Sequence, residues 1–290
     1  MNKKILVLGA NGMAGHIITI GLKESFNFYD IMSVARSNSI IKPTYILDVL
    51  NFKDLEALIN TTMPNIIINC IGILNKNAEN NPEKAVLINS YLPHFLEAIT
   101  KNTNIKIIHI STDCVFSGKE GNYLETSFKN GIGYYAQSKA LGEIINKKDL
   151  TFRTSIIGPE LNNAGIGLFN WFYNQKGEIN GYTKAIWTGI TTIELLNAIK
   201  AAITENLCGL YHLVNNKRIS KFDLLNLIKD EFVKNIILIE DNNYKIDKSL
   251  LNTRKDFDFK VKEYKEMVSD MNFWIKKHKN LYNHYNTIIN

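Results

Sequence analysis

The chain has 290 residues, which is enough for one substantial core or for two lobes that share one. Hydrophobic residues make up 45% and charged residues 21%, as in ordinary globular proteins, and no stretch reaches the roughly 18 apolar residues of a membrane span. The net charge of +6 suits an anionic ligand, but no basic run interleaved with aromatic residues indicates a nucleic-acid surface. We therefore expect neither a membrane nor a nucleic acid as a partner.

The first half of the chain alternates short apolar runs with longer amphipathic runs. Buried strands are predicted at 3–10, 31–36, 65–72 and 105–112, and helices at 16–25, 54–62 and 85–100. This alternation predicts an α/β fold of the Rossmann type, with a doubly wound parallel sheet. The pattern weakens from Pro159 onward, where glycines, aromatic residues and asparagines scatter. We expect a dinucleotide-binding domain at 1–157 and a smaller, mainly substrate-binding lobe at 158–290, with a segment at about 190–205 that packs back on the first domain.

A glycine-rich turn follows the first predicted strand. Gly9, Gly12 and Gly15 in GANGMAG stand between that strand and the helix after it. Glycine lets the turn close tightly and lets the backbone approach a pyrophosphate, whose charge is stabilised at the helix N-terminus. Glycines at such spacings also occur by chance, but the strand–turn–helix context favours a dinucleotide site. Asn11 and Met13 belong to the same turn and are expected to contact the cofactor.

The end of the second predicted strand indicates which dinucleotide is used. NAD-binding sites usually present a carboxylate about 20 residues after the glycines, where it contacts the ribose hydroxyls. The sequence there is SVARSNS, which lacks an acidic residue and contains Arg36, Ser37 and Ser39. A guanidinium and hydroxyl groups favour a 2′-phosphate. We therefore expect NADPH, with NADH as the alternative cofactor and a loop-capping role as the alternative for Arg36.

The stretch YYAQSK places two tyrosines before a lysine. On a helix, Tyr135 and Lys139 are four residues apart and share a face, whereas Tyr134 is five residues from Lys139 and points elsewhere. A nearby ammonium group lowers the pKa of a tyrosine, so Tyr135 is the expected proton donor. A tyrosine and a lysine at this spacing also occur by chance in many helices, so the motif needs support from the rest of the chain.

Together with the glycine turn, YYAQSK resembles the Y-x-x-x-K motif of the extended short-chain dehydrogenase/reductases. The runs STDCVFSG, YYAQSKALGE and FRTSIIG are similar to T-D-x-V-F-x-G, Y-x-x-S-K-x-x-G-E and R-T-S. These motifs occur in that order in the dTDP-4-dehydrorhamnose reductases and related nucleotide-sugar 4-ketoreductases. The resemblance implies NAD(P)H-dependent reduction of the 4-keto group of a nucleotide-linked 4-keto-6-deoxy sugar, in deoxysugar and surface-polysaccharide biosynthesis, by a protein that could form a homodimer.

The resemblance also implies roles for individual residues. Thr112 matches the hydroxyl that binds the substrate carbonyl, Tyr135 the acid, and Lys139 the cation that tunes the acid and holds the nicotinamide ribose. Asn89 matches an asparagine that completes the family's proton relay, with a structural role as the alternative. Further positions expected to contact the cofactor are Asp48, Val49, Cys70, Ile71, Gly72 and Ile156.

Asp113 and Cys114 follow the catalytic threonine and are expected to contact the substrate. A 4,6-dehydratase would carry a glutamate where this chain has Cys114, so dehydration is not expected. The GDP-fucose synthases place an epimerising cysteine at this position, which leaves an epimerase or epimerase/reductase as an alternative. Those enzymes also need a histidine from the second lobe; the early part of that lobe, 167–184, has none, and His212 lies too late to match.

The segment GYTKAIWTGITTIEL resembles the part of rhamnose-type reductases that carries Q-x-G-x-P-T, but it lacks the proline and has Trp187-Thr188-Gly189 instead. Ile156 stands after R-T-S, where those reductases carry a tryptophan. Because of these departures, the resemblance does not determine which sugar is the substrate. Trp187 and Thr188 are expected at the sugar, and Lys184 and Arg254 at the diphosphate, with core packing and exposed charge as the alternatives.

A non-enzymatic sensor of NADP(H) is the alternative from another class of protein. Such proteins usually lose the tyrosine or the lysine of the motif, and this chain keeps both. The three cysteines have no metal-ligand spacing and cannot all pair, so we expect a reducing, cytoplasmic location and no metal site.

Overall fold

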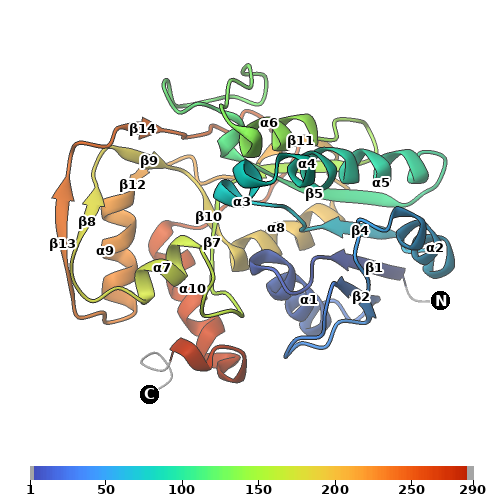
Figure 1. The fold of residues 1–290 in the computed structure, drawn as a ribbon, viewed down its shortest axis with the longest axis horizontal. Coiled ribbons are helices and arrows are strands. Elements are labelled where there is room, and N and C mark those ends of the chain that lie inside the picture. Colours follow the sequence, from blue (N-terminus) through green and yellow to red (C-terminus); the bar gives the residue numbers. More distant parts are fainter. Residues whose placement is uncertain (1–2, 286–290) are drawn as a thin grey trace.

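The computed structural model describes residues 3–285. At its centre lies a seven-stranded parallel sheet with the strand order β11-β6-β5-β4-β1-β2-β3 (Figure 1). Its strands are β1 (Lys3–Leu8), β2 (Tyr29–Ala35), β3 (Tyr45–Ile46), β4 (Ile66–Asn69), β5 (Lys106–Thr112), β6 (Leu150–Thr154) and β11 (Gly209–His212). The strand order reverses on either side of β1, and the carboxyl ends of the strands open a crevice at such a switch point.

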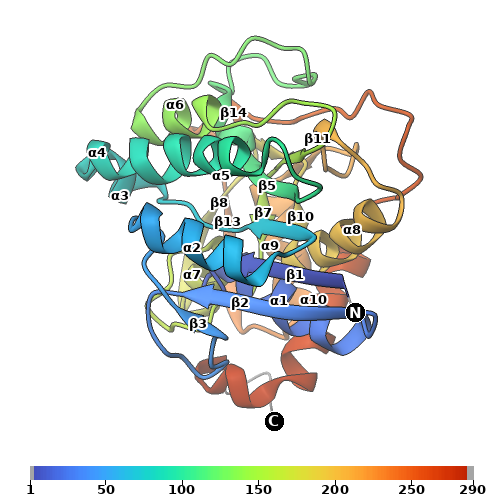
Figure 2. The same cartoon turned by 90° about the vertical axis from the view of Figure 1, so that its right-hand side faces the viewer.

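Helices cover both faces of this sheet, as Figure 2 shows. They include α1 (Met13–Ser25), α2 (Phe52–Thr62), α5 (Leu92–Thr100), α6 (Tyr134–Leu141) and α8 (Thr192–Thr204). Along β1, Ile5 and Val7 belong to a core with α1 and α8, whereas Leu6 and Leu8 belong to a second core with α2 and α5. Side chains alternate between the faces of a strand, so a strand buried on both faces has to be apolar throughout. The run ILVL meets this requirement.

The second lobe is built from two small sheets and three helices, seen at the left of Figure 1. β8 pairs in parallel with β13, and β9 lies between β12 and β14. The elements are α7 (Leu168–Tyr173), β8 (Gly177–Tyr182), β9 (Ala185–Trp187), β12 (Ile219–Ser220), α9 (Lys221–Glu231), β13 (Ile236–Asp241), β14 (Ile246–Asp247) and α10 (Tyr264–Lys277). A short pair, β7 (Ile156–Ile157) and β10 (Ile190–Thr191), stands between this lobe and the central sheet. Among residues 3–285, no helix combines the length and apolar character that crossing a membrane requires.

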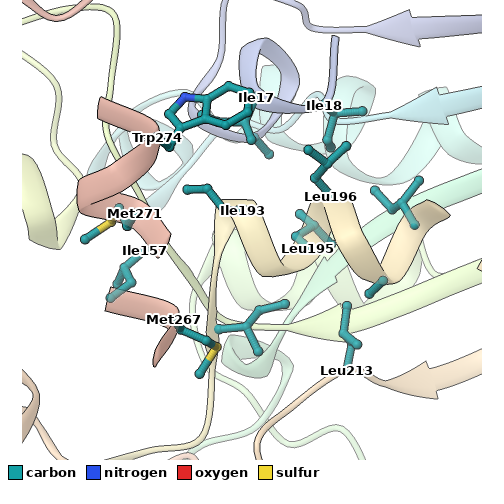
Figure 3. Packing of buried hydrophobic residues seen from close by; sticks show 14 of the residues in the cluster. Ile17, Ile18, Ile157, Ile193, Leu195, Leu196, Leu213, Met267, Met271 and Trp274 are labelled. Carbon is teal, nitrogen blue, oxygen red and sulfur yellow. The ribbon is translucent and has the colours of Figure 1, made fainter. Parts of the chain in front are cut away.

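The chain returns to the first domain after β10. Helix α8 packs on α1 so closely that a Cβ atom at Gly21 would lie 2.1 Å from Cδ2 of Leu196. Figure 3 shows Ile17 and Ile18 of α1 beside Leu196 of α8, with Trp274 of α10 next to them. The next strand, β11, adds to the edge of the central sheet beside β6. We therefore propose that the returning segment is longer than 190–205 and runs on to His212.

The helix expected at 85–100 is interrupted in the structure. It consists of α4 (Pro82–Ala85), a π-helical turn η1 (Val86–Tyr91) and α5, and it follows a short helix, α3 (Asn75–Asn80), that the sequence did not predict. Pro93 has no N–H group, so the carbonyl of Asn89 lacks its α-helical partner four residues later. A π turn accommodates such a mismatch. α3 was missed because NKNAEN is polar apart from Ala78 and shows no apolar periodicity.

Candidate active site

The glycine turn forms one end of a groove of about 680 Å³ at the carboxyl ends of the central strands. Gly9 has a φ of +84°, and a Cβ atom at Gly15 would lie 2.0 Å from the carbonyl oxygen of Gly9. Glycine is therefore required at both positions for α1 to start against the turn. Gly12 begins α1 without a side-chain cap, so the first N–H groups of the helix remain available to an anion at the groove.

Most of the residues expected at the cofactor line this groove. They are Gly9, Asn11, Gly12, Arg36, Ser37, Asp48, Val49, Cys70, Ile71 and Gly72. Gly15 supports the turn from within α1, Met13 packs near Gly167, and Ile156 pairs with Ile190 in β7 and β10. These three residues do not line the groove, and neither do Tyr135 and Lys139, which were also expected at the cofactor.

Eleven residues that line the groove were not predicted. They are Val34, Ala35, Leu47, Leu50, Ile73, Leu74, Asn77, Asn81, Lys84, Ile88 and Ile166. Asn77 lies on α3, Asn81 stands between α3 and α4, Lys84 and Ile88 lie on α4 and η1, and Ile166 comes from the loop before α7. The sequence signal around α3 and α4 was weak, because Asn77, Asn81 and Lys84 are polar.

At the far end of the groove, β2 ends without a carboxylate and is followed by the positively charged Arg36. Arg36 is exposed directly after β2. Asn11 of the glycine turn holds the following loop: its Nδ2 donates to the carbonyl of Ser37 at 2.9 Å, and its Oδ1 accepts from the Ser39 hydroxyl at 2.7 Å. The backbone of Ser37 is thus fixed next to the glycine turn. This arrangement fits a dinucleotide whose pyrophosphate lies at α1 and whose 2′-phosphate lies near Arg36.

Thr112 and Tyr135 meet at the end of β5. The Thr112 hydroxyl accepts a hydrogen bond from the Cys114 N–H at 3.1 Å and donates to Asp113 Oδ1 at 3.1 Å. The Tyr135 hydroxyl lies close to it. Burial, together with the neighbouring Cys114, raises the pKa of Tyr135 above its ordinary value, although the nearby Thr112 hydroxyl opposes the shift. The phenol therefore keeps its proton at neutral pH and is suited to the role of an acid.

Lys139 lies buried on the same helix, and Tyr134 is half exposed. The Lys139 ammonium donates to the carbonyl of Ile110 at 2.7 Å and lies 3.5 Å from Nε2 of His109. Burial lowers the pKa of Lys139 to about 8, with Glu143 and Cys70 opposing the shift. The expectation that Lys139 lowers the pKa of Tyr135 is wrong for this structure. Desolvation dominates at Tyr135, and the ammonium is bonded to the carbonyl of Ile110 instead.

The start of α6, which carries both residues, is capped from a distant part of the chain. Glu79 Oε1 and Oε2 accept hydrogen bonds from the N–H groups of Tyr135 and Tyr134, each at 3.1 Å. A Cβ atom at Gly133 would lie 2.6 Å from Glu79 Oε1, so glycine makes room for the carboxylate. A carboxylate at a helix N-terminus satisfies free N–H groups and complements the helix dipole. Glu79 was not predicted.

Asn89 is fully buried in the π turn. Its Oδ1 accepts from the N–H of Ile73 at 2.9 Å, and its Nδ2 donates to the carbonyl of Ile73 at 2.9 Å and to the hydroxyl of Ser138 at 3.0 Å. The side chain thereby joins Ile73, which lines the groove, to Ser138 of α6. In this structure its contacts are those of a positioning residue, and a part in proton transfer stays a prediction.

A buried ion pair lies beneath the site and uses residues of two sequence motifs. Arg153 binds Glu143 through both Nε (2.8 Å) and Nη2 (2.7 Å). Glu143 also accepts from the hydroxyl of Ser111 at 2.8 Å, next to Thr112. Nη1 of Arg153 bonds His212 Nε2 at 2.7 Å, and His212 Nδ1 is bonded to the carbonyl of Leu251. The glutamate of KALGE and the arginine of FRTS therefore support the active site rather than contact a ligand.

A second cavity of about 450 Å³ opens between the catalytic strand and the second lobe. Asp113, Cys114 and Trp187 line it, as expected. Two lysines that were not predicted, Lys221 and Lys248, also line it. The Lys221 ammonium lies 4.7 Å from the centre of the Trp187 ring, and Lys248 is hydrogen-bonded to Cys114. The cavity wall also carries aromatic and amide side chains, namely Trp171, Asn180, Tyr182 and Tyr244, and it is completed by Ser155 and the aliphatic residues Leu168, Ala185, Ile186, Leu225 and Ile246.

Lys184, Thr188 and Arg254 do not line this cavity, contrary to expectation. Lys184 is exposed in the turn before β9. The Thr188 hydroxyl accepts from the N–H of Leu250 at 2.9 Å inside the lobe. The guanidinium of Arg254 is held by the side chain of Asp256 and by the carbonyls of Cys208 and Leu210. The side chains of Thr188 and Arg254 are thus occupied by the protein itself, and an exposed turn carries Lys184 away from the cavity.

The geometry around Cys114 does not favour an epimerase. Burial, followed by the charge of Asp113, raises the pKa of the Cys114 thiol to about 11, so the thiol remains protonated at neutral pH. No histidine lines either cavity among the residues that the structure describes, and His212 is bound to Arg153 beneath the site. The second acid–base group that epimerisation needs is therefore not supplied by a histidine.

Comparisons with known proteins agree with this geometry. The dTDP-4-dehydrorhamnose reductase of Aggregatibacter actinomycetemcomitans is 27% identical over 81% of this chain and 81% of that protein. The crystal structure of a hypothetical dTDP-4-dehydrorhamnose reductase from Sulfolobus tokodaii has a TM-score of 0.75 and 28% identity, and the match covers 90% of this chain and 98% of that one. A dTDP-4-dehydrorhamnose reductase from Bacillus anthracis, solved in complex with NADP, has a TM-score of 0.80 at 21% identity over 94% and 100% of the two chains, which shows a shared fold.

The family model described as RmlD substrate binding domain matches residues 3–270. This match spans both lobes, including the cofactor groove and the second cavity. The chain belongs to the RmlD substrate binding domain family.

Proposed function

We propose that the protein reduces the 4-keto group of a nucleotide-linked 4-keto-6-deoxy sugar with NADPH, in deoxysugar and surface-polysaccharide biosynthesis. The observation that carries the proposal is the pair of neighbouring hydroxyl groups of Thr112 and Tyr135. This pair lies at the end of β5, next to Asp113 and Cys114 of the second cavity, and Lys139 lies on the same helix as Tyr135. A ketone bound there would face a proton donor and a second hydroxyl.

The chemistry needs few groups. NADPH, when bound, supplies the hydride that adds to the ketone carbon. Negative charge then develops on the ketone oxygen, and the hydroxyls of Thr112 and Tyr135 stabilise it through hydrogen bonds. Tyr135, whose pKa is raised by burial, donates its proton to that oxygen. The product is the secondary alcohol at carbon 4, and the protein is left with a phenolate to be reprotonated.

The second cavity supports a nucleotide-linked substrate. Lys221 and Lys248 place two positive charges beside Asp113 and Cys114, close to the reacting end. Two such charges suit a diphosphate. Tyr182 and Tyr244, with ring centres 5.0 Å apart, offer exposed aromatic surface for a base. The sugar, the diphosphate and the base would thus follow one another from the catalytic hydroxyls to the aromatic residues.

The experiment that tests this function is steady-state oxidation of NADPH with a dTDP-linked 4-keto-6-deoxy sugar as the substrate. The free keto sugar serves as the comparison, because it lacks the diphosphate and base whose binding energy orients the ketone. We expect turnover of the nucleotide sugar only. Efficient reduction of the free sugar would contradict the nucleotide-linked substrate. Binding of NADPH without turnover of any nucleotide sugar would instead favour the sensor alternative.

Lys221 and Lys248 provide an internal check on the substrate. Replacement of either lysine by methionine is expected to raise KM for the nucleotide sugar roughly tenfold, as loss of a hydrogen bond to a charged group does. Lys184→Met is the matched control, because Lys184 is exposed and lines neither cavity. An effect of Lys184→Met as large as that of Lys221→Met would argue against the placement of the diphosphate.

We also propose a cytoplasmic location and a homodimer. Tyr134, Leu141 and Ile145 expose apolar surface on and just after α6, although single exposed apolar residues are common on monomers. Light scattering of the purified protein would measure the mass, and a monomer at micromolar concentration would remove the dimer proposal.

A further inference from the structure

We propose that Tyr282, near the C-terminal end of the described chain, is a positioning residue for the dinucleotide, because it holds the glycine turn through His16. This inference rests on the proposed use of NADPH. Tyr282 lies 266 residues from His16 in the sequence, and both side chains are fully buried. In both ribbon views, the C-terminal segment lies beside α1 (Figures 1 and 2).

The contact is a chain of three side-chain hydrogen bonds and ends on the backbone of the turn. Trp274 Nε1 can only donate, and it lies 2.9 Å from the Tyr282 hydroxyl. That hydroxyl lies 2.7 Å from His16 Nε2, and His16 Nδ1 lies 2.8 Å from the carbonyl oxygen of Gly12. A carbonyl only accepts, so Nδ1 carries the proton and Nε2 accepts from Tyr282.

This order of donors and acceptors gives a hydrogen-bond partner to every polar atom in the series from Trp274 to Gly12. His16 is neutral, because burial lowers its pKa to about 4. Each group donates in one direction, from Trp274 through Tyr282 and His16 to Gly12. No alternative arrangement of the protons pairs all four groups, since the indole and the carbonyl have fixed roles. Trp274 is itself held by packing beside Ile17 of α1, as Figure 3 shows.

The series of hydrogen bonds ends on the carbonyl of Gly12, the residue that begins α1. Gly12 accepts both from the imidazole of His16 and from the backbone N–H of His16, at 2.8 and 3.1 Å. Its own N–H donates to the carbonyl of Gly9 at 2.9 Å. The orientation of the Gly12 backbone therefore determines where the first N–H groups of α1 point. Those N–H groups are the expected donors to the pyrophosphate.

A neighbouring tyrosine supports the opposite wall of the same groove. The Tyr285 hydroxyl donates to Asn170 Oδ1 at 2.8 Å and accepts from the N–H of Glu160 at 3.2 Å. Nδ2 of Asn170 donates to the carbonyl of Gly165, next to Ile166, which lines the groove. The C-terminal segment thus contacts both the glycine turn and the loop that faces it.

The test is the affinity of Tyr282→Phe for NADPH, measured by cofactor fluorescence, with adenosine 2′-monophosphate as a second ligand. This mononucleotide carries the 2′-phosphate and no pyrophosphate, so its binding depends on Arg36 and not on the N–H groups at the start of α1. We expect Kd for NADPH to rise about three- to tenfold, the range for loss of one buried hydrogen bond. Kd for adenosine 2′-monophosphate and kcat at saturating NADPH should change by less than about twofold.

Tyr211→Phe is the matched control, because Tyr211 is equally buried and its hydroxyl bonds Asn252, away from both cavities. It should leave both affinities unchanged. Unchanged NADPH affinity in Tyr282→Phe would overturn the inference. An equal loss of affinity for NADPH and for adenosine 2′-monophosphate would overturn it too, because it would indicate a general loss of structure. If the unmodified protein did not bind NADPH, both this inference and the assignment of NADPH as the cofactor would be overturned. If it bound NADPH but did not reduce the nucleotide sugar, only the proposed reaction would be overturned.

Discussion

Glu79 accepts a hydrogen bond from the backbone N–H of Tyr135, at 3.1 Å, across 56 residues of sequence. The same carboxylate accepts from Tyr134, so one side chain of α3 holds the start of the catalytic helix. Gly133 and its positive φ allow this approach. The position of the tyrosine hydroxyl relative to Thr112 therefore depends on a residue outside both catalytic motifs.

Glu79→Ala is expected to lower kcat about tenfold, because loss of the cap costs about 0.5–2 kcal/mol of helix stability and lets the tyrosine shift. Glu79→Gln keeps one carbonyl acceptor and should recover part of the loss. Glu83→Ala is the control, since Glu83 is exposed on α4 and contacts neither tyrosine. The measurement is steady-state turnover at saturating NADPH. Equal rates for the alanine variants at 79 and 83 would refute the role of the cap.

Tyr135→Phe should lower turnover by roughly 10²–10⁴, because it removes the proton and one hydrogen bond to the developing oxyanion. The turnover of Tyr134→Phe should stay within about tenfold of that of the unmodified protein, since Tyr134 is half exposed and five residues from Lys139. Both variants would be measured with the nucleotide sugar across pH. Loss of turnover in Tyr134→Phe together with normal turnover in Tyr135→Phe would show that the assignment from the helical face is wrong.

The pH dependence of reduction should report Lys139. Its pKa is lowered to about 8, mainly by burial, so the ammonium is present below pH 8 and is lost as the pH rises through that value. If the ammonium holds the cofactor ribose, kcat/KM should fall above about pH 8. Lys139→Met should be slower at pH 7 and should lack this decline. A decline that persists unchanged in Lys139→Met would assign it to another group.

Arg36→Asp should reverse the cofactor preference. The exposed guanidinium at the end of β2 would bind the 2′-phosphate, whereas a carboxylate repels it and accepts from ribose hydroxyls. The ratio of kcat/KM for NADPH to that for NADH should fall by roughly 10- to 100-fold, as expected for loss of a charge-assisted hydrogen bond. Lys42→Asp is a control with the same change of charge on the same loop. Equal use of NADPH and NADH by the unmodified protein would contradict the prediction.

Arg153→Leu should lower the free energy of unfolding by about 3–5 kcal/mol near pH 7, because it leaves the buried charge of Glu143 without its principal partner. Burial acts to raise the pKa of Glu143, but the hydrogen bonds and charge of Arg153 outweigh it and hold the pKa below the ordinary value. A carboxylate with a lowered pKa adds stability above the pKa of the unfolded chain, and this stability is lost as the pH falls through the folded pKa. Urea unfolding should therefore show a difference between the two proteins that is large at pH 7 and smaller below about pH 4. A difference independent of pH would mean that the ion pair is not its source.

The sequence by itself determined the features that depend on local periodicity. Runs such as ILVL and the three isoleucines at 66–68 are apolar at every position, as a strand buried on both faces requires, and they predicted the parallel sheet. The spacing of Gly9, Gly12 and Gly15 predicted the dinucleotide turn, because steric limits on a tight turn act over a few residues. The separation of Tyr135 and Lys139 placed them on one helical face for the same reason.

Only the tertiary structure decided which distant side chains complete these local elements. Lys221 and Lys248 line the second cavity in place of the expected Lys184 and Arg254, because α9 and the segment after Tyr244 fold against β9. Glu79 reaches α6, and Tyr282 reaches His16, through packing that brings together residues far apart in the chain. Periodicity reports which face of an element is buried, but not which other element covers it. Pairing at long range depends on the crossing of whole elements, and no short stretch of the sequence records it.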